Sequence, residues 1–289
     1  MVPAHFGADV LGTKIRQEFV AELFTLPEMS LWQTGYPPAN EDYLEWIDLL
    51  ESVVEARDSY TMVELGAGFG RWVVRAAFAV KQHHASMPCR LIAVEAEPLM
   101  YQWMRMHFED NSVDPTRHRL IHAASSGECG HALFYVGGPR GGAWDLPTNK
   151  WYGQCLAKDY DVSGEYEKDG EYQGFPVRLH KSGWRSIQVP SVTLKELMSD
   201  VSRVDFLDMD IEGQELPVVR SSIVEMDAKV KRVHIGTHSP EIEAELRDIL
   251  SKHGWCSLRD YPIATRQETP WGPIEFGNGV QSWVNPRLK

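Results

Sequence analysis

From residue 60 onward, short apolar runs alternate with amphipathic stretches. Apolar runs that predict strands cover 62–65, 91–94, 120–124, 204–209, 230–235, 255–258 and 280–284. Stretches with apolar side chains at helical spacing predict helices over 71–81, 98–108, 193–199, 215–223 and 241–252. Strands that alternate with helices predict βαβ units and a parallel sheet with right-handed crossovers. We therefore expect an α/β protein with a doubly wound, seven-stranded, mostly parallel sheet.

Two regions depart from this rhythm. Residues 1–59 predict an N-terminal helical segment, with a short helix over 14–24 and a second from the N-cap Asn40 to about residue 57, which packs on the sheet edge or covers the ligand site. Residues 60–289 then form the ligand-binding domain. Within it, residues 125–190 are rich in Gly, Trp and Tyr and predict an insertion over the active site, with a small hairpin at 175–189.

The composition limits the class of partner. Of 289 residues, 43% are hydrophobic and 24% charged, which is ordinary for a globular protein. A formal net charge of −12 repels phosphate backbones, so we expect a small-molecule substrate and no nucleic acid. No run of about eighteen apolar residues predicts a membrane span, and the first residues do not resemble a secretory signal. The four cysteines lack metal-ligand spacing, which favours reduced thiols in a cytoplasmic protein. A homo-oligomer is compatible with the sequence.

The clearest motif is a glycine-rich turn between the first strand and its helix. Gly66, Gly68 and Gly70 allow the backbone to turn tightly and to approach a ligand. A dinucleotide-binding turn would have its third glycine where Arg71 stands. The spacing GxGxG, with Glu64 in the strand before it, instead resembles the first motif of class I methyltransferases. Their cofactor has no pyrophosphate, and an acidic strand residue suits its cationic amino-acid end.

Residues at the ends of the next two strands complete the predicted cofactor site. Glu95 ends the second strand, about where a carboxylate accepts hydrogen bonds from both ribose hydroxyls, and Glu97 is the alternative. Ala124 and Ser125 follow the third strand, where the edge of an adenine would lie.

Four carboxylates cluster after the fourth strand, in the segment DMDIEGQE. Asp210 and Glu212 are the candidate catalytic residues, because ligands bind beyond the carboxyl ends of parallel strands. Asp208 and Glu215 are better explained as partners of the following helix N-terminus, where negative charge is favourable.

These motifs together resemble the FkbM family of methyltransferases over roughly residues 60–255. Its D-x-E-G-x-E signature is matched by Asp210, Glu212, Gly213 and Glu215. The resemblance implies a class I methyltransferase fold, S-adenosyl-L-methionine as the cofactor, and O-methylation of a sugar or another small-molecule hydroxyl.

Two histidines follow on the fifth strand. His238 lies opposite Asp210 in this topology, so either could accept the hydroxyl proton, and His234 shares the same face of the strand. Some related methyltransferases bind Mg²⁺ through carboxylates after strands four and five. Here His238 and Ser239 follow strand five, so we do not favour Mg²⁺, although Asp210 would be a ligand if it binds.

The substrate pocket and the rival functions rest on fewer residues. Trp144, Trp151, Tyr152 and Gln154, in the insertion, either line the substrate pocket or anchor the insertion on the domain. An NAD-dependent oxidoreductase is the alternative enzyme, which Arg71 disfavours. A cofactor-binding protein without catalysis is the other alternative, and it does not explain the acidic and histidine side chains.

Overall fold

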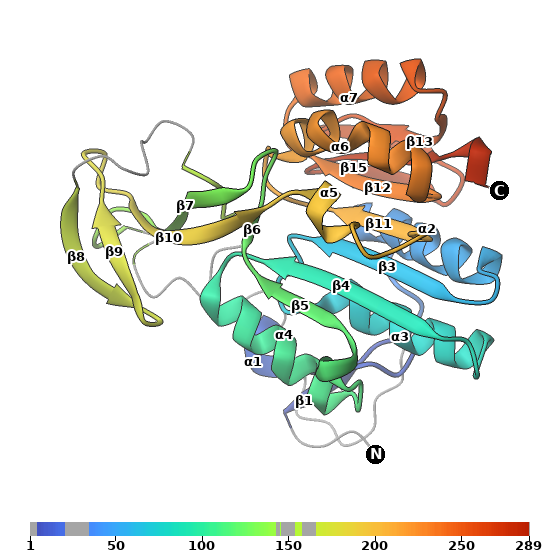
Figure 1. Ribbon diagram of the computed structural model, residues 1–289, viewed down its shortest axis with the longest axis horizontal. Helices are drawn as coiled ribbons and strands as arrows, with labels where there is room; N and C mark the ends of the chain where they lie inside the picture. The colour runs from blue at the N-terminus through green and yellow to red at the C-terminus, as the bar shows by residue number, and fades with distance from the viewer. Residues whose placement is uncertain (1–4, 21–34, 143–144, 146–153, 158–165, 289) are drawn as a thin grey trace.

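The centre of the molecule is a seven-stranded sheet with the order β13-β16-β12-β11-β3-β4-β5 (Figure 1). The computed structural model describes residues 5–20, 35–142, 145, 154–157 and 166–288. The strands are β3 (Tyr60–Leu65), β4 (Cys89–Glu95), β5 (Arg119–His122), β11 (Phe206–Met209), β12 (Arg232–Thr237), β13 (Cys256–Tyr261) and β16 (Gly279–Val284). In this sheet β16 runs antiparallel to β12 and β13, and the other neighbours pair in parallel. The predicted doubly wound, mostly parallel sheet is confirmed.

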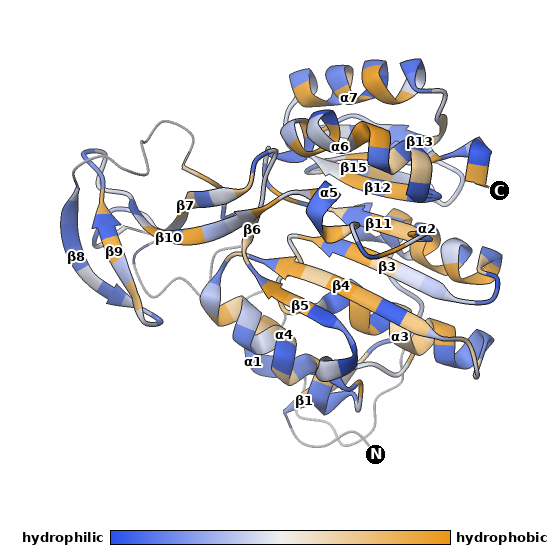
Figure 2. Cartoon of the chain, viewed as in Figure 1, coloured by the Kyte–Doolittle hydropathy of each residue, from blue (hydrophilic) through white to orange (hydrophobic). Residues whose placement is uncertain are grey.

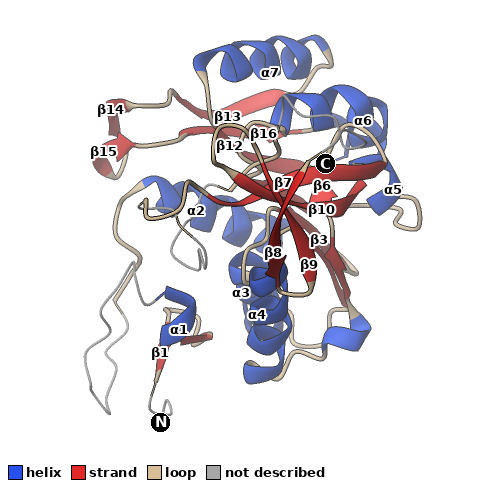
Figure 3. Cartoon of the chain, turned by 90° about the vertical axis from the view of Figure 1, so that its left-hand side faces the viewer, coloured by secondary structure: helices blue, strands red, loops and turns tan. Residues whose placement is uncertain are grey.

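Helices cover both faces of the sheet (Figure 3). One layer comprises α2 (Glu41–Glu55), α3 (Arg71–His83) and α4 (Pro98–Asp110), and the other α5 (Leu194–Leu197), α6 (Glu215–Lys229) and α7 (Pro240–Lys252). Successive strand residues face opposite sides, so Met62 packs with the first layer and Val63 with the second. Because both faces are buried, the inner strands are apolar along most of their length, as β4 shows in Figure 2.

The parallel strands end level with one another. Leu65 of β3 pairs with Val94 of β4 and with Met209 of β11, and Ile235 of β12 pairs with Met209. The loops that follow these strands therefore meet at one edge of the sheet, which brings the predicted motifs together.

The insertion forms its own small sheet, which projects to the left in Figure 1. Its strands are β6 (Ala124–Ser125), β7 (Gly130–Gly137), β8 (Glu167–Tyr172), β9 (Phe175–Leu179) and β10 (Arg185–Val192). The predicted hairpin at 175–189 is present as β9 and β10, within a larger sheet that β6, β7 and β8 complete. Residues 154–157 pair with β7 through Tyr135 N to Cys155 O (3.0 Å) and Ala157 N to Leu133 O (2.8 Å).

The N-terminal segment differs from the prediction. The helix expected over 14–24 begins only at Gln17, because Lys14–Arg16 form strand β2, which pairs with β1 (Phe6–Ala8). The backbone N–H of Lys14 donates to the Asn111 side chain at 2.7 Å, which further fixes the strand. Helix α1 (Gln17–Val20) follows, and residues 21–24 lie outside the described part of the chain.

The remaining elements lie at the periphery. They are the 3-10 helices η1 (Pro115–Arg117) and η2 (Pro286–Leu288) and the hairpin of β14 (Thr265–Thr269) and β15 (Gly272–Phe276). The hairpin extends beyond the helical layers in Figure 3. Within the described ranges, none of the helices combines the length and apolarity that crossing a membrane requires.

Candidate active site

The three glycines of the turn after β3 have two different roles. All have positive φ, of +78° at Gly66, +53° at Gly68 and +76° at Gly70. A Cβ on Gly66 would lie 1.8 Å from the carbonyl oxygen of Asp210, and one on Gly70 would lie 2.9 Å from Cγ of Met104. A Cβ on Gly68 would meet nothing within 4 Å. Gly66 and Gly70 thus permit close packing inside the protein, and Gly68 leaves space open to a ligand.

Glu95 is hydrogen-bonded to this turn. Its Oε2 accepts a hydrogen bond from the Gly68 N–H at 2.7 Å, and its Oε1 accepts one from the Glu97 N–H at 2.6 Å. Burial raises the pKa of Glu95 to about 7, against the effect of these backbone donors. Glu97, the alternative predicted residue, caps α4 by accepting from Met100 N at 2.6 Å. Glu95 is therefore the carboxylate that belongs to the glycine turn.

Glu64 lies inside the fold, where its side chain is 2% exposed. Its carboxylate accepts from Val73 N at 2.8 Å, in the first turn of α3, and Glu64 pairs in register with Asp208 of β11. Burial and then repulsion from Asp208 raise the pKa of Glu64 well above its ordinary value. The structure thus places Glu64 beneath the turn, against the N-terminus of α3.

A first pocket, which we call the turn pocket, opens between the glycine turn and the insertion. Four predicted residues meet there: Gly66, Ala124, Ser125 and Gln154. Its other lining residues are Val94, Ala96, Ala123, Phe134, Cys155, Leu156, Ile211 and Gln214. Ser125 is 8% exposed, and its Oγ has no hydrogen-bond partner among the described residues. A largely apolar pocket with a few polar groups suits a heteroaromatic ring.

A second pocket, the acidic pocket, lies where β11 and β12 end, beside α2. It is lined by Glu41, Asp42, Glu45, Asp208, Asp210, His234, Gly236, Asn278, Gly279 and Val280. Asp208 is 3% exposed, and its Oδ1 has no hydrogen-bond partner in the described part of the chain. Burial raises the pKa of Asp208 to about 6, and burial together with Asp208 raises the pKa of Glu45 well above its usual value. The pocket is thus rich in hydrogen-bond acceptors.

His234 is held in the acidic pocket by a residue that sequence reasoning missed. Its Nδ1 lies 2.9 Å from Oδ2 of Asp48, on α2, and Asp48 has no exposed surface. Burial acts to lower the pKa of His234, but Asp48 raises it above its ordinary value. Asp48 also accepts from Arg232 at 2.9 Å and from Arg259 at 2.5 Å. The sequence offers no signal for this role beyond an acidic residue within an amphipathic helix.

His238 meets the acidic motif after β11, as its place in the topology predicted. Its Nε2 lies 3.2 Å from Oδ1 of Asp210 and 3.3 Å from Oε2 of Glu212, and its Nδ1 lies 2.9 Å from Oε1 of Glu215. Burial acts to lower the pKa of His238, but these three carboxylates raise it to about 12. The ring therefore holds its proton at neutral pH, which does not suit a proton acceptor.

The pKa of Asp210 is shifted in the opposite direction. Burial acts to raise its pKa, but His238 lowers it below the ordinary value, so the carboxylate is ionised at neutral pH. Its side chain is 57% exposed and lines the acidic pocket. Three predicted substrate residues, Trp144, Trp151 and Tyr152, lie outside the described residues, and Gln154 lies in the turn pocket.

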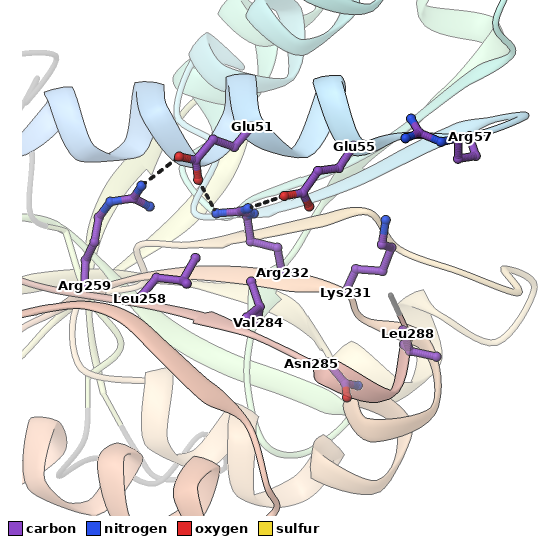
Figure 4. Close-up of a pocket in the computed structure, with 10 residues that line it drawn as sticks. All are labelled: Glu51, Glu55, Arg57, Lys231, Arg232, Leu258, Arg259, Val284, Asn285 and Leu288. Carbon is purple, nitrogen blue, oxygen red and sulfur yellow. Dashed lines mark hydrogen bonds and ion pairs between the residues drawn. The ribbon is translucent and has the colours of Figure 1, made fainter.

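A third hollow, the outer groove, has a volume of about 760 Å³, and Figure 4 shows the residues that line it. It is lined by Glu51, Glu55, Arg57, Lys231, Arg232, Leu258, Arg259, Val284, Asn285 and Leu288. Glu51 accepts from both Arg232 and Arg259, and these two arginines also reach Asp48. Arg232 begins β12, so the groove lies at the amino end of that strand, opposite the acidic pocket.

Comparisons with known proteins agree with the sequence motifs. A family model described as the methyltransferase FkbM domain matches residues 64–254. The chain is 27% identical over 255 residues to a protein of Jannaschia sp. (strain CCS1) named "Putative methyltransferase", which covers 87% of this chain and 82% of that protein.

Two solved structures are also similar to the chain. One is precorrin-6y C5,15-methyltransferase from Geobacter metallireducens GS-15, with 9% identity, a TM-score of 0.44, and coverage of 88% of this chain and 93% of that chain. The other is a methyltransferase FkbM from Methylobacillus flagellatus KT, with 12% identity, a TM-score of 0.45, and coverage of 80% and 45%. At these TM-scores the assignment of the fold rests on the strand order instead.

Proposed function

The chain belongs to the FkbM methyltransferase family, and we propose that it transfers the methyl group of S-adenosylmethionine to a hydroxyl of a small molecule, such as a sugar or a natural-product intermediate. Family membership supports methyl transfer over the oxidoreductase that the glycine turn alone left open. It also supports an active enzyme over a protein that only binds the cofactor.

The turn pocket is the proposed site of the adenosyl group. Its apolar walls, Val94, Ala96 and Phe134, suit the faces of a purine, and the unpartnered Oγ of Ser125 suits its polar edge. Glu95 stands in the chain between two lining residues, Val94 and Ala96, and its carboxylate can accept further hydrogen bonds from ribose hydroxyls. The open side of Gly68 leaves room for the cofactor's amino-acid end.

The acidic pocket is the proposed site of the acceptor. An ionised carboxylate such as that of Asp210 only accepts hydrogen bonds, and Oδ1 of the neighbouring Asp208 has no partner among the described residues. The pocket therefore suits a ligand that brings several O–H donors, as a sugar does. The acidic pocket lies close to the glycine turn, because Gly66 packs against the backbone of Asp210.

The proposed mechanism is a direct in-line transfer. S-adenosylmethionine supplies a methyl group on a positively charged sulfur, which leaves as a neutral thioether. The two pockets would bring the acceptor hydroxyl beside the methyl group, and such alignment can be worth on the order of 7–11 kcal/mol. As the new C–O bond forms, the ionised carboxylate of Asp210 takes the hydroxyl proton. Residues 154–156, which pair with β7, form one wall of the turn pocket and would limit the access of water to the methyl group.

One observation carries this proposal: Gly66 after β3, Ala96 after β4, and Ala124 and Ser125 after β5 line a single pocket. Isothermal titration of the full chain with S-adenosylmethionine and, separately, with NAD⁺ tests the cofactor. We expect saturable binding of the first and none of the second. Radiolabelled methyl transfer to a panel of sugars and other polyols then tests the reaction. Label in amine acceptors only would refute O-methylation.

A further inference from the structure

One ligand atom from each of Asp210, Glu212 and His238 lies within 4.8 Å of the other two. His238 Nε2 stands 3.2 Å from Oδ1 of Asp210 and 3.3 Å from Oε2 of Glu212. Around an octahedral ion with bonds of about 2.1 Å, ligand atoms lie about 3 Å apart when adjacent and about 4 Å apart when opposite. The three side chains therefore have the spacing of one part of a metal coordination sphere.

The Nε2 atom of His238 indicates that a ligand binds beside it. Although two carboxylate oxygens are close, buried Nε2 has no partner with hydrogen-bond geometry among the described residues. The side chain of His238 is 11% exposed, so water has little access to the ring. A buried nitrogen that faces the space between two carboxylates is oriented for a shared cation, which would displace the proton that the metal-free ring holds there.

Glu215 fixes the orientation of that ring. Its side chain has no exposed surface, and its Oε1 faces His238 Nδ1 at 2.9 Å. The same oxygen accepts from the backbone N–H of Ile211 (3.3 Å) and of Gly213 (3.0 Å), in the loop that carries Asp210 and Glu212. Metal-binding histidines commonly have such a carboxylate on the ring nitrogen that faces away from the ion, and losing it typically weakens metal binding about 10- to 100-fold.

We propose that Asp210, Glu212 and His238 bind one divalent transition-metal ion, and that Glu215 is the residue that positions His238 for it. Mg²⁺ prefers oxygen ligands, whereas ions such as Mn²⁺ and Zn²⁺ accept a mixture of imidazole and carboxylates. The role of the ion in catalysis rests on the proposed function, because an acceptor hydroxyl bound to it would have a lower pKa. Its binding does not depend on that function.

Titration of the chelator-treated, desalted full-length protein with MnCl₂ tests the proposal without any turnover. We expect one saturable Mn²⁺ site per chain by calorimetry, and at least tenfold weaker binding of MgCl₂. Glu212→Gln and Asp210→Asn each replace a charged carboxylate ligand by a neutral amide and should weaken Mn²⁺ binding more than tenfold. Glu215→Gln leaves all three ligands in place and should weaken it about 10- to 100-fold.

Glu241→Gln is the matched control. Glu241 is exposed and, like His238, follows β12, where it stands in the first turn of α7. Its Mn²⁺ affinity should equal that of the unmodified protein. No saturable Mn²⁺ binding, or unchanged binding by both Glu212→Gln and Asp210→Asn, would overturn the site. Unchanged binding by Glu215→Gln would overturn its positioning role, and equal affinity for Mg²⁺ would overturn the choice of ion. Titrating the same variants with S-adenosylmethionine shows separately whether the proposed cofactor site fails.

Discussion

Gly66→Ala is the most informative single substitution, because it lowers the stability of the fold in two separate ways. The first is backbone strain, since an alanine at φ +78° costs about 1–2 kcal/mol. The second is steric, since the new Cβ would lie 1.8 Å from the Asp210 carbonyl oxygen, whereas real Cβ contacts are essentially never under 3.0 Å. Relieving this overlap requires a displacement of more than 1 Å, and overpacking of this kind costs about 1–3 kcal/mol. The free energy of unfolding should therefore fall by about 2–5 kcal/mol in total.

Gly68→Ala is the matched comparison. It has the backbone cost, at φ +53°, but its Cβ would point into open space. We expect a loss of only about 1–2 kcal/mol of stability, or a few degrees in Tm. Because that open space is the proposed location of the cofactor, affinity for S-adenosylmethionine should fall at least about tenfold, or about 1.4 kcal/mol.

Chemical denaturation and calorimetry on both variants test this reasoning together. The expected pattern is a larger loss of stability in Gly66→Ala, and a loss of cofactor affinity out of proportion to stability in Gly68→Ala. Equal stability of the two variants would refute the close contact between Gly66 and Asp210. Full cofactor affinity in Gly68→Ala would refute the placement of the cofactor.

Three further predictions concern single carboxylates and one histidine. Because burial raises the pKa of Glu95 to about 7, affinity for S-adenosylmethionine should rise as pH increases through about 7, where the carboxylate ionises. Calorimetry across pH should find that the affinity of Glu95→Gln does not change with pH. The same pH dependence of affinity in both proteins would contradict the role of Glu95 in binding the cofactor. Asp48→Ala leaves Arg232 and Arg259 without their shared buried partner and should lower the free energy of unfolding in urea by about 3–5 kcal/mol. A decrease below about 0.5 kcal/mol would show that the ion pairs of Asp48 contribute little to stability. His238→Gln should lower turnover while calorimetry finds cofactor affinity unchanged, and unaltered turnover would assign the ring to packing.

The sequence predicted the central sheet because its strands are buried on both faces. The parallel strands appear as short apolar runs, with β12, β11, β3 and β4 inside the sheet and β5 at its edge. Helices α3 and α4 between them show a 3.6-residue period. The insertion's sheet gave no such signal. Strand β8, Glu167–Tyr172, is mostly polar and exposed, and it is a strand because β9 pairs with it. Likewise, Lys14–Arg16 are too few for a pattern, and pairing with β1 decides their conformation.

The residues of the candidate site likewise fall into two groups, those that the sequence predicts and those that only the structure reveals. Asp210, Glu212 and Glu95 were predictable because the ends of parallel strands converge, whatever the packing around them. Asp48 and Glu45 were not, because both belong to α2, and periodicity alone cannot show which acidic side chain of a helix is buried, as Asp48 is, or lines a pocket, as Glu45 does. Only the tertiary contacts of α2 with β11, β12 and β16 give these residues their roles.

Asp48 also has a consequence for how new acceptor specificity could arise. This one buried carboxylate ties α2 to two strands of the sheet through Arg232 and Arg259, so the helix cannot slide or tilt without exposing unmatched charges to an apolar interior. The wall that α2 contributes to the acidic pocket is therefore a rigid boundary. Laboratory evolution toward other acceptors should accumulate its changes in the insertion, and leave α2 almost untouched.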